Sequence, residues 1–312
     1  MARDSTGPVM WWSRAVIVLP TEIAAQMEAL GLRVDHPVGV WDGPPDPAPT
    51  GCRFYVPAYM AGEWAMTAMA DMPLLEVCQL PTAGYEHAVM HLPPGVTLCN
   101  AAGVHDASTA ELAVALILAR LRRLDDGARA MSSGQFLHGR FESLADKHVV
   151  VIGAGGIGRA LARRLEGFEC HVTLVARTSR DGVRSRAELP DLLPVADVVV
   201  LAVPLDETTR GLVDASFLRR MKDGSLLVNI ARGAIADTDA LLAEAGRLQF
   251  ALDVTDPEPL PPDHPLWRSS GVLISPHIGG NTSAFLPRVA RLVAEQARRW
   301  ISGQSALNVV VF

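Results

Sequence analysis

The chain has 312 residues, of which 49% are hydrophobic and 20% are charged, and its formal net charge is −6. This length allows about two domains of roughly 150 residues each, with enough apolar residues for packed cores. The net negative charge argues against a general electrostatic surface for nucleic acid or anionic lipid, so neither is expected as a partner.

The cysteines and the apolar runs exclude further classes of protein. Cys52, Cys78, Cys99 and Cys170 are far apart and form no C-x-x-C pair, so we interpret them as reduced thiols of a cytoplasmic protein rather than a disulfide framework or a metal site. Charged and turn-forming residues interrupt the first 20 residues, so no export signal is expected there. The most apolar run, residues 112–119, is far shorter than the roughly 20 residues that span a bilayer.

The N-terminal part alternates short apolar runs with helix-like segments, as α/β domains with parallel strands do. Strands are expected within residues 14–20, 52–60 and 75–84, and helices within residues 21–31 and 63–73. From Ser108 the sequence predicts a helix that begins with a capping box formed by Ser108 and Glu111. This helix is apolar on nearly every face, so we expect it to lie between layers or between subunits.

A second, regular run of strands and helices follows residue 147. The expected strands are apolar throughout, which is typical of a parallel sheet covered on both faces. They lie at residues 148–153, 171–176, 196–204, 224–231, 250–255 and 271–277, with helices at 156–167, 214–222, 238–246 and 283–302.

The sequence "VVVIGAGGIGRA" places Gly153, Gly155 and Gly158 in G-x-G-x-x-G spacing between a strand and a helix. The first glycine allows a tight turn, the second lets a pyrophosphate approach the backbone, and the third lets helix and strand pack closely. The start of the helix supplies amide donors to the phosphates. In this context the pattern predicts a dinucleotide-binding site.

The next strand ends in "LVARTSR", where a chain that binds NAD usually has an acidic residue for the ribose hydroxyls. Here Arg177, Thr178, Ser179 and Arg180 offer cationic groups and hydroxyls, which suit the extra phosphate of NADP. We therefore predict NADP(H) as the preferred cofactor, with NAD possible. The alternative is that both arginines are solvated loop charges in a chain that uses NAD.

Polar side chains follow three later strands, at the sheet edge where ligands bind in such folds. They are Arg232, then Asp253 and Glu258, and finally His277. Alone, each could be a loop ion pair, a solvated charge or a capping histidine. Together they suit carbonyl reduction: a guanidinium holds a carboxylate and polarises the carbonyl, an imidazolium gives a proton, and a carboxylate raises the histidine pKa.

From about residue 83 to residue 281 the sequence resembles the D-isomer-specific 2-hydroxyacid dehydrogenase family, which includes glyoxylate and hydroxypyruvate reductases and phosphoglycerate dehydrogenases. The matching segments include "VIGAGGIGRALARRL", "LLVNIARG", "ALDVTDPEPLPPDHPLW" and "SPHIGG". The resemblance implies a two-lobed α/β fold and a homodimer formed through the helix near Leu112. A flavodoxin-like substrate-binding domain would comprise residues 1–98 and 288–312, and a Rossmann dinucleotide-binding domain residues 99–287.

The resemblance also implies residue roles in reducing short 2-keto acids to D-2-hydroxy acids. Arg232 would bind the substrate carboxylate, Glu258 would orient and charge His277, and His277 would be the acid/base. The backbone amides of Ala83 and Gly84 would also hold the carboxylate. The implied cofactor-binding residues are Gly153, Gly155, Gly156, Ile157, Gly158, Arg177, Thr178, Ser179, Arg180, Val203, Pro204, Thr209, Ala231, Asp253 and Thr109.

Two departures from the family pattern, Ala202 in place of a histidine and Asp206 in place of a threonine, affect only the expected loop contacts on the cofactor side.

Related activities leave alternatives open. Formate dehydrogenases pair the histidine with glutamine, so Glu258 argues against that reaction. We expect no added regulatory domain of the long phosphoglycerate dehydrogenases, which leaves a short NAD-dependent enzyme of that kind as an alternative. Corepressors that sense NAD(H) keep the same triad, so a binding protein with little turnover is the other alternative.

Overall fold

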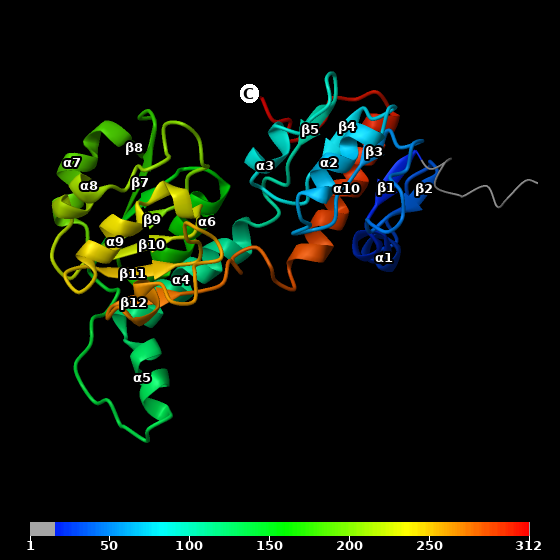
Figure 1. Ribbon diagram of the computed structural model, residues 1–312. Coiled ribbons are helices and arrows are strands. Elements are labelled where there is room, and N and C mark those ends of the chain that lie inside the picture. The colour runs from blue at the N-terminus through cyan, green and yellow to red at the C-terminus, as the bar shows by residue number, and fades with distance from the viewer. Residues whose placement is uncertain (1–15, 312) are drawn as a thin grey trace, which may run out of the picture. The chain divides into compact units, whose positions relative to one another are not determined.

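The chain forms two compact units in the computed structural model, which describes residues 16–311. Within the described residues, unit 1 comprises residues 16–105 and 283–311, and unit 2 comprises Asp106–Thr282 (Figure 1). The predicted absence of an export signal falls largely on residues 1–15, outside the described residues. No helix within residues 16–311 has the length and apolar character needed to cross a membrane.

Unit 1 is built on a five-stranded parallel sheet in the order β2-β1-β3-β4-β5, the flavodoxin-like arrangement. The strands are β1 (Ile17–Leu19), β2 (Val38–Val40), β3 (Phe54–Tyr55), β4 (Val77–Gln79) and β5 (Thr97–Cys99). The helices are α1 (Thr21–Ala29), α2 (Trp64–Thr67), α3 (Glu86–Val89) and α10 (Phe285–Ile301).

Helices cover both faces of this sheet. On one face, Ile23 and Met27 of α1 pack with Val289 and Val293 of α10. On the other face, the buried side chains of α2 and α3 form a separate core with Tyr55. The C-terminal segment lies along β5, where Cys99 and Val309 form an antiparallel bridge. The returning end of the chain therefore completes unit 1.

Unit 2 is built on a seven-stranded parallel sheet in the order β12-β11-β10-β9-β6-β7-β8. The strands are β6 (His148–Ile152), β7 (His171–Ala176), β8 (Val183–Ser185), β9 (Val198–Leu201), β10 (Leu226–Asn229), β11 (Gln249–Leu252) and β12 (Val272–Ile274). The helices are α4 (Asp106–Leu121), α5 (Leu124–Met131), α6 (Gly156–Leu165), α7 (Leu189–Leu192), α8 (Ala215–Arg220) and α9 (Thr238–Glu244). The order reverses between β6 and β9, as in a Rossmann fold, and confirms the predicted fold class.

Successive side chains of β6 enter different cores because strand residues alternate between the two faces of a sheet. Val149 and Val151 pack with α4 and α6, whereas Val150 and Ile152 pack with α8 and α9. The reversal point of the sheet is thus fixed from both faces, and the turn after β6 has a rigid base.

Several elements differ from the predictions. Helix α4 begins at Asp106 and not at Ser108, so the predicted capping box is wrong, and Ser108 is buried within the helix. Asp106 favours an N-terminal turn as well as a serine does, and it comes first. Strands β2, β5 and β8 were not predicted. Each is short and is not apolar throughout, because it contains Gly39 in β2, Thr97 in β5 or Arg184 in β8.

Helix α5 projects from unit 2 and is followed by residues 132–147, which contain no helix or strand (Figure 1). The junction between α4 and α5 is fixed by a buried ion pair, in which Arg120 Nη1 lies 2.5 Å from Asp125 Oδ2. The other terminal nitrogen of Arg120 donates to Gln249 on β11. This projection is therefore anchored to the sheet at its base.

Candidate active site

The glycine-rich turn after β6 has the shape that a dinucleotide requires. A Cβ at Gly153 would collide with the carbonyl of Ala202, and a Cβ at Gly158 would collide with the carbonyl of Gly153. A Cβ at Gly155 would meet nothing within 4 Å. Close packing thus accounts for Gly153 and Gly158, while Gly155 faces open space where a pyrophosphate could approach the backbone.

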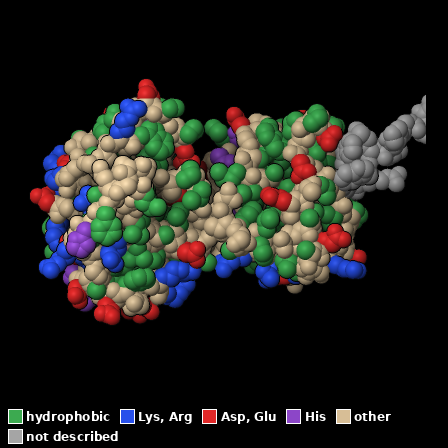
Figure 2. Space-filling model, turned by 90° about the horizontal axis from the view of Figure 1, so that it is seen from below, with side chains coloured by type: hydrophobic (Ala, Val, Ile, Leu, Met, Phe, Trp, Pro, Cys, Tyr) green, Lys and Arg blue, Asp and Glu red, His purple; other side chains and the backbone are tan. Residues whose placement is uncertain are grey.

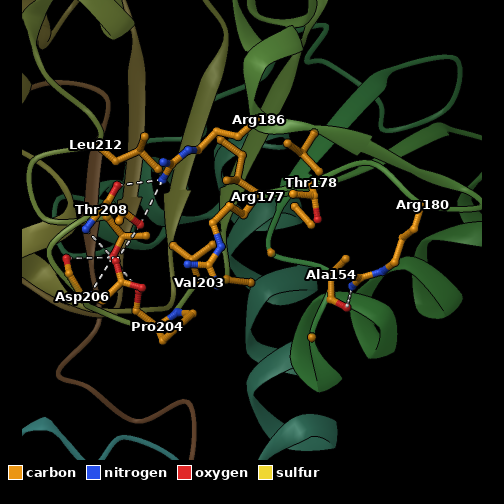
Figure 3. Close-up of a pocket in the computed structure, with 17 residues that line it drawn as sticks. Ala154, Arg177, Thr178, Arg180, Arg186, Val203, Pro204, Asp206, Thr208 and Leu212 are labelled. Atoms are coloured by element: carbon orange, nitrogen blue, oxygen red, sulfur yellow. Dashed lines mark hydrogen bonds between the residues drawn. The ribbon is translucent and has the colours of Figure 1, made fainter. Parts of the chain in front are cut away.

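A pocket opens beside this turn (Figure 3). Its wall comes from the turn after β6, the end of β7 and the loop after β9. The predicted cofactor residues that line it are Gly153, Gly155, Arg177, Thr178, Arg180, Val203, Pro204 and Thr209. It lies at the carboxyl ends of the strands, the edge at which ligands bind in doubly wound sheets.

The other predicted cofactor residues lie outside this pocket lining: Thr109, Gly156, Ile157, Gly158, Ser179, Ala231 and Asp253. Gly156 and Ile157 belong to the first turn of α6, and Ser179 is an exposed residue of the loop after β7. Thr109 is buried in α4 close to Gly279, and it therefore lies near the loop that carries His277.

Three arginines surround the pocket. The guanidinium of Arg180 donates to the carbonyl of Ala154 at 3.2 Å, and that of Arg186 donates to the carbonyl of Thr208 at 2.7 Å. Figure 3 shows Arg177 pointing into the space between these two contacts. Backbone carbonyls orient a guanidinium without neutralising it, and within residues 16–311 none of the three forms an ion pair with a carboxylate. The pocket therefore carries a positive charge suited to a phosphate.

Asp206, one of the departures from the family pattern, also lines this pocket. Its carboxylate accepts hydrogen bonds from the backbone and the hydroxyl of Thr208, both at 2.7 Å. Thr209 completes the turn by donating from its hydroxyl to the carbonyl of Pro204. Asp206 therefore shapes the loop whose Thr208 carbonyl receives Arg186.

Arg232 follows β10 in a turn held by Asn229. The buried amide of Asn229 donates to the carbonyl of Arg232 at 2.9 Å and accepts from the backbone of Ala231 at 3.0 Å. The guanidinium of Arg232 donates to the carbonyl of Ala231 at 2.7 Å. A Cβ at Gly233 would collide with the carbonyl of Thr255, so the turn packs directly on the loop that leads to Glu258.

His277 and Glu258 form a hydrogen-bonded pair, with 2.5 Å between Nδ1 and Oε1. The bond to Glu258 raises the pKa of His277 above its usual value, against the opposing effects of partial burial and of the charge on Arg232. Burial by itself raises the pKa of Glu258, but the bond and charge of His277 bring it below its usual value. The structure thus brings Arg232, Glu258 and His277 within electrostatic reach of one another and favours a charged imidazolium.

Asp253 holds the loop that carries His277. Its carboxylate accepts hydrogen bonds from the Ser275 hydroxyl at 2.6 Å and from the backbone of Ile278 at 3.0 Å and Gly279 at 2.9 Å. The backbone of His277 itself donates to the Asp253 carbonyl, and its φ is +51°, in the left-handed region. The loop thus keeps a non-glycine residue in a costly conformation.

Ala83 and Gly84 belong to unit 1, in the turn between β4 and α3. The carbonyl of Ala83 accepts a hydrogen bond from the side-chain amide of Asn100 at 2.8 Å. The carbonyl of Gly84 accepts one from the Thr82 hydroxyl at 2.7 Å. Among the described residues, no acceptor is bonded to the backbone N–H of either residue.

Sequence reasoning missed Arg186, Asn229 and Asn100. Arg186 directly follows the unpredicted strand β8, so no signal marked its position. Asn229 and Asn100 each end a strand, where an Asx side chain commonly bonds to nearby backbone, and that position is the signal that could have found them. No group of three or more His, Cys, Asp or Glu within residues 16–311 could hold a metal ion.

Comparisons with known proteins all lead to one family. Residues 114–279 match the family model for the D-isomer specific 2-hydroxyacid dehydrogenase, NAD binding domain. Glyoxylate/hydroxypyruvate reductase A of Arabidopsis thaliana is 33% identical over 253 residues, which are 78% of this chain and 80% of the relative. A mitochondrial formate dehydrogenase of Hordeum vulgare is 32% identical over 266 residues, 80% of this chain and 69% of the relative.

Among solved structures, a D-isomer specific 2-hydroxyacid dehydrogenase of Xanthobacter autotrophicus Py2, in complex with NADPH and MES, has a TM-score of 0.79 and 26% identity. The match covers 95% of this chain and 98% of that one. The fold, the glycine turn and the matched segment all point to one group of oxidoreductases with a nicotinamide dinucleotide cofactor. The chain belongs to the D-isomer specific 2-hydroxyacid dehydrogenase family.

Proposed function

We propose that the protein is an NADPH-preferring reductase that converts short 2-keto acids, of the glyoxylate or hydroxypyruvate type, to D-2-hydroxy acids. The observation that carries the proposal is the His277–Glu258 pair at 2.5 Å, with Arg232 in electrostatic reach. A relative named glyoxylate/hydroxypyruvate reductase supports the substrate class.

In this proposal each side chain acts on a defined part of the substrate. Arg232 binds the carboxylate and polarises the adjacent carbonyl, since its planar fork matches a carboxylate in a bidentate manner. His277, charged through its bond to Glu258, gives its proton to the carbonyl oxygen as negative charge develops there. The amides of Ala83 and Gly84 are further donors to a carboxylate. When bound, NADPH supplies the hydride that the carbonyl carbon accepts.

The preference for NADPH rests on the pocket beside the glycine turn. Arg177, Thr178 and Arg180 line it at the place where an acidic residue would select NAD, and Arg186 adds a third cation. Ser179 is proposed as a further hydroxyl donor from the same loop. The neighbour from Xanthobacter autotrophicus, described in complex with NADPH, is consistent with this choice.

The proposal also includes the predicted cofactor residues that lie outside the pocket lining. Asp253 is proposed to contact the nicotinamide carboxamide. A carboxylate has about four acceptor sites, so its hydrogen bonds to Ser275, Ile278 and Gly279 leave room for another donor. Thr109, Gly156, Ile157, Gly158 and Ala231 are proposed to shape the cofactor site through the backbone.

A spectrophotometric assay tests the function. Purified protein is mixed with NADPH or NADH and with glyoxylate, hydroxypyruvate or pyruvate, and oxidation of the reduced cofactor is followed. We expect turnover of at least one ketoacid and a kcat/KM at least about tenfold higher with NADPH, equivalent to about 1.4 kcal/mol. Formate and phosphoglycerate are each incubated with NAD in parallel, and reduction of the cofactor is followed. Turnover of formate would favour a formate dehydrogenase, and turnover of phosphoglycerate would favour a phosphoglycerate dehydrogenase. No turnover of any substrate would favour the corepressor alternative.

An Arg177→Asp variant tests the cofactor preference. A carboxylate at this position repels the 2′-phosphate, so the variant should lose kcat/KM with NADPH much more than with NADH and shrink or invert the ratio. The neighbouring Arg184, which forms an ion pair with Glu188, provides the control, and Arg184→Asp should leave the ratio unchanged. If Arg177→Asp keeps the NADPH preference, the arginine is only a loop charge.

We also propose that the protein is a cytoplasmic homodimer. The cytoplasmic location rests on the cysteines, none of which forms a disulfide. The interface was predicted at the helix near Leu112, which is α4, and Leu112 packs partly in the core of unit 2. We therefore propose that the interface extends to the exposed apolar side chains beside α4. The most exposed apolar side chains near α4 belong to α5 and the segment that follows it. They include Phe136, which is 90% exposed. Figure 2, which views the molecule from below, the side toward which α5 projects in Figure 1, shows hydrophobic side chains interspersed with basic ones.

A further inference from the structure

The turn that contains Ala83 and Gly84 is held by a series of hydrogen bonds to its carbonyl groups. The ring nitrogen Nε2 of His105 lies 3.0 Å from the carbonyl of Pro81. The backbone of Ala101 donates to the carbonyl of Thr82 at 2.8 Å, and the side-chain amide of Asn100 donates to that of Ala83 at 2.8 Å. The next carbonyl, of Gly84, is held by the Thr82 hydroxyl. Every carbonyl from Pro81 to Gly84 is therefore occupied.

Occupied carbonyls fix the direction of the amides. A trans peptide is planar, so its N–H points opposite to its C=O. With the Thr82 and Ala83 carbonyls bonded to the segment after β5, the N–H groups of Ala83 and Gly84 both point away from that segment. Neither donates to a described residue. The next amide, of Tyr85, is already used, because it donates to the Glu86 carboxylate at 2.8 Å.

The orientation of the Asn100 side chain is fixed from two directions. Its Oδ1 accepts from the backbone of Ala102 at 3.1 Å, which keeps its Nδ2 directed at Ala83. Its backbone carbonyl accepts from the buried side chain of Gln79 at 3.0 Å. Gln79 is in turn bonded at 2.8 Å to Gln296 of α10, which is also buried.

We propose that Asn100 is a positioning residue for substrate binding: by holding the Ala83 carbonyl, it directs the amides of Ala83 and Gly84 toward the carboxylate of the ketoacid. This inference rests on the proposed function for the identity of the anion. Asn100 does not itself touch the substrate. Its loss lets the Ala83–Gly84 peptide rotate, so that the pair of donors no longer faces one anion.

The test measures binding of a carboxylate separately from turnover. Oxalate, which has carboxylates and no reducible carbonyl, is titrated by calorimetry into the full-length protein and into Asn100→Ala, and KM and kcat are measured for glyoxylate. We expect the variant to bind oxalate about tenfold more weakly and to raise the KM for glyoxylate by a similar factor. The kcat and the KM for NADPH should stay close to those of the unmodified protein.

Asn308→Gly is the matched control. Asn308 also donates from its side-chain amide to a backbone carbonyl of this segment, that of Ala102 at 3.0 Å, without contacting the turn. Its φ of +52° is one that glycine adopts readily. This variant should bind oxalate like the unmodified protein. If Asn100→Ala fails to fold, Asn100→Ser, which keeps a polar side chain but lacks the Nδ2 donor to the Ala83 carbonyl, should weaken oxalate binding several-fold.

The outcomes separate this inference from the proposed function. Unchanged oxalate binding in Asn100→Ala, or in Asn100→Ser where the first variant does not fold, overturns the inference even if the protein reduces glyoxylate. An unmodified protein that does not bind oxalate also overturns it, because the turn then holds no carboxylate. A protein that binds oxalate through Asn100 and reduces no ketoacid keeps the inference and loses the proposed function.

Discussion

The pair formed by His277 and Glu258 is the residue-scale feature with the clearest chemical consequence. If His277 delivers the proton, His277→Ala should lower kcat for ketoacid reduction by about two to four orders of magnitude, the usual contribution of a positioned acid. The dissociation constant of NADPH should change little, since His277 does not line the cofactor pocket. Steady-state kinetics and a fluorescence titration check both expectations, and near-normal turnover would remove His277 from the mechanism.

Glu258→Gln should act on the pH profile. The bond to Glu258 raises the pKa of His277, so the acid form persists to higher pH in the unmodified protein. Reduction needs this acid form and is lost as pH rises through the His277 pKa. With glutamine the pKa falls, and the descending limb of kcat/KM against pH moves to lower pH. Glu244→Gln, which breaks a separate ion pair with Arg247, should leave the limb in place.

Arg232→Lys should raise KM and lower kcat together. A lysine keeps the charge but cannot hold a carboxylate with two parallel bonds, and in the proposed mechanism the same guanidinium also polarises the carbonyl. The variant should therefore lose far more activity with a ketoacid than with an uncharged aldehyde. Equal losses with both substrates would show that Arg232 does not bind the carboxylate.

The sequence showed these residues because each follows a strong strand pattern and carries a side chain with distinctive chemistry. Asn100 and Asn229 carry equally specific hydrogen bonds, but an asparagine at a strand end is also an ordinary turn residue. Only the positions of the carbonyls that they hold reveal their roles. The backbone conformation of the turns that contain those carbonyls cannot be predicted from the sequence.

At the scale of elements, the β6–α6 turn gives a prediction that separates stability from binding. Gly158→Ala should destabilise unit 2, because the new Cβ would collide with the Gly153 carbonyl and separate helix from strand. Gly155→Ala should leave the unfolding temperature nearly unchanged, because its Cβ meets no protein atom within 4 Å. It should instead raise the dissociation constant of NADPH at least about tenfold, or roughly 1.4 kcal/mol, by blocking the approach of the pyrophosphate.

Thermal denaturation and a cofactor titration distinguish the two glycine variants. A Gly155→Ala protein that binds NADPH normally would show that the pyrophosphate does not lie on this turn. The apolar strands of unit 2 and the glycine turn were predictable because strand, glycine spacing and helix follow one another in a regular order along the chain. Strand β8 contains Arg184 and Ser185 and so shows no apolar run, and its absence from the prediction also hid Arg186, which begins the next turn.

At the scale of the whole molecule, the exposed side chains beyond α5 predict association. The chain has a mass of 33.4 kDa, so the proposed dimer should sediment with about twice that mass. Phe136→Asp places a charge in the apolar surface and should shift the protein toward the single-chain mass. Met90→Asp, at an exposed methionine of unit 1, is the control and should not. An unmodified protein that sediments as a single chain would contradict the dimer.

The left-handed backbone of His277 has a consequence for the evolution of this molecule. A position with φ of +51° suits glycine, and a residue with a Cβ there costs about 1 kcal/mol or more. His277→Gly and His277→Ala both lose the bond to Glu258, yet the glycine variant should be the more stable of the two in chemical denaturation. If His277 is the proposed proton donor, the fold accepts this backbone cost in order to keep a side chain with that chemistry at this position.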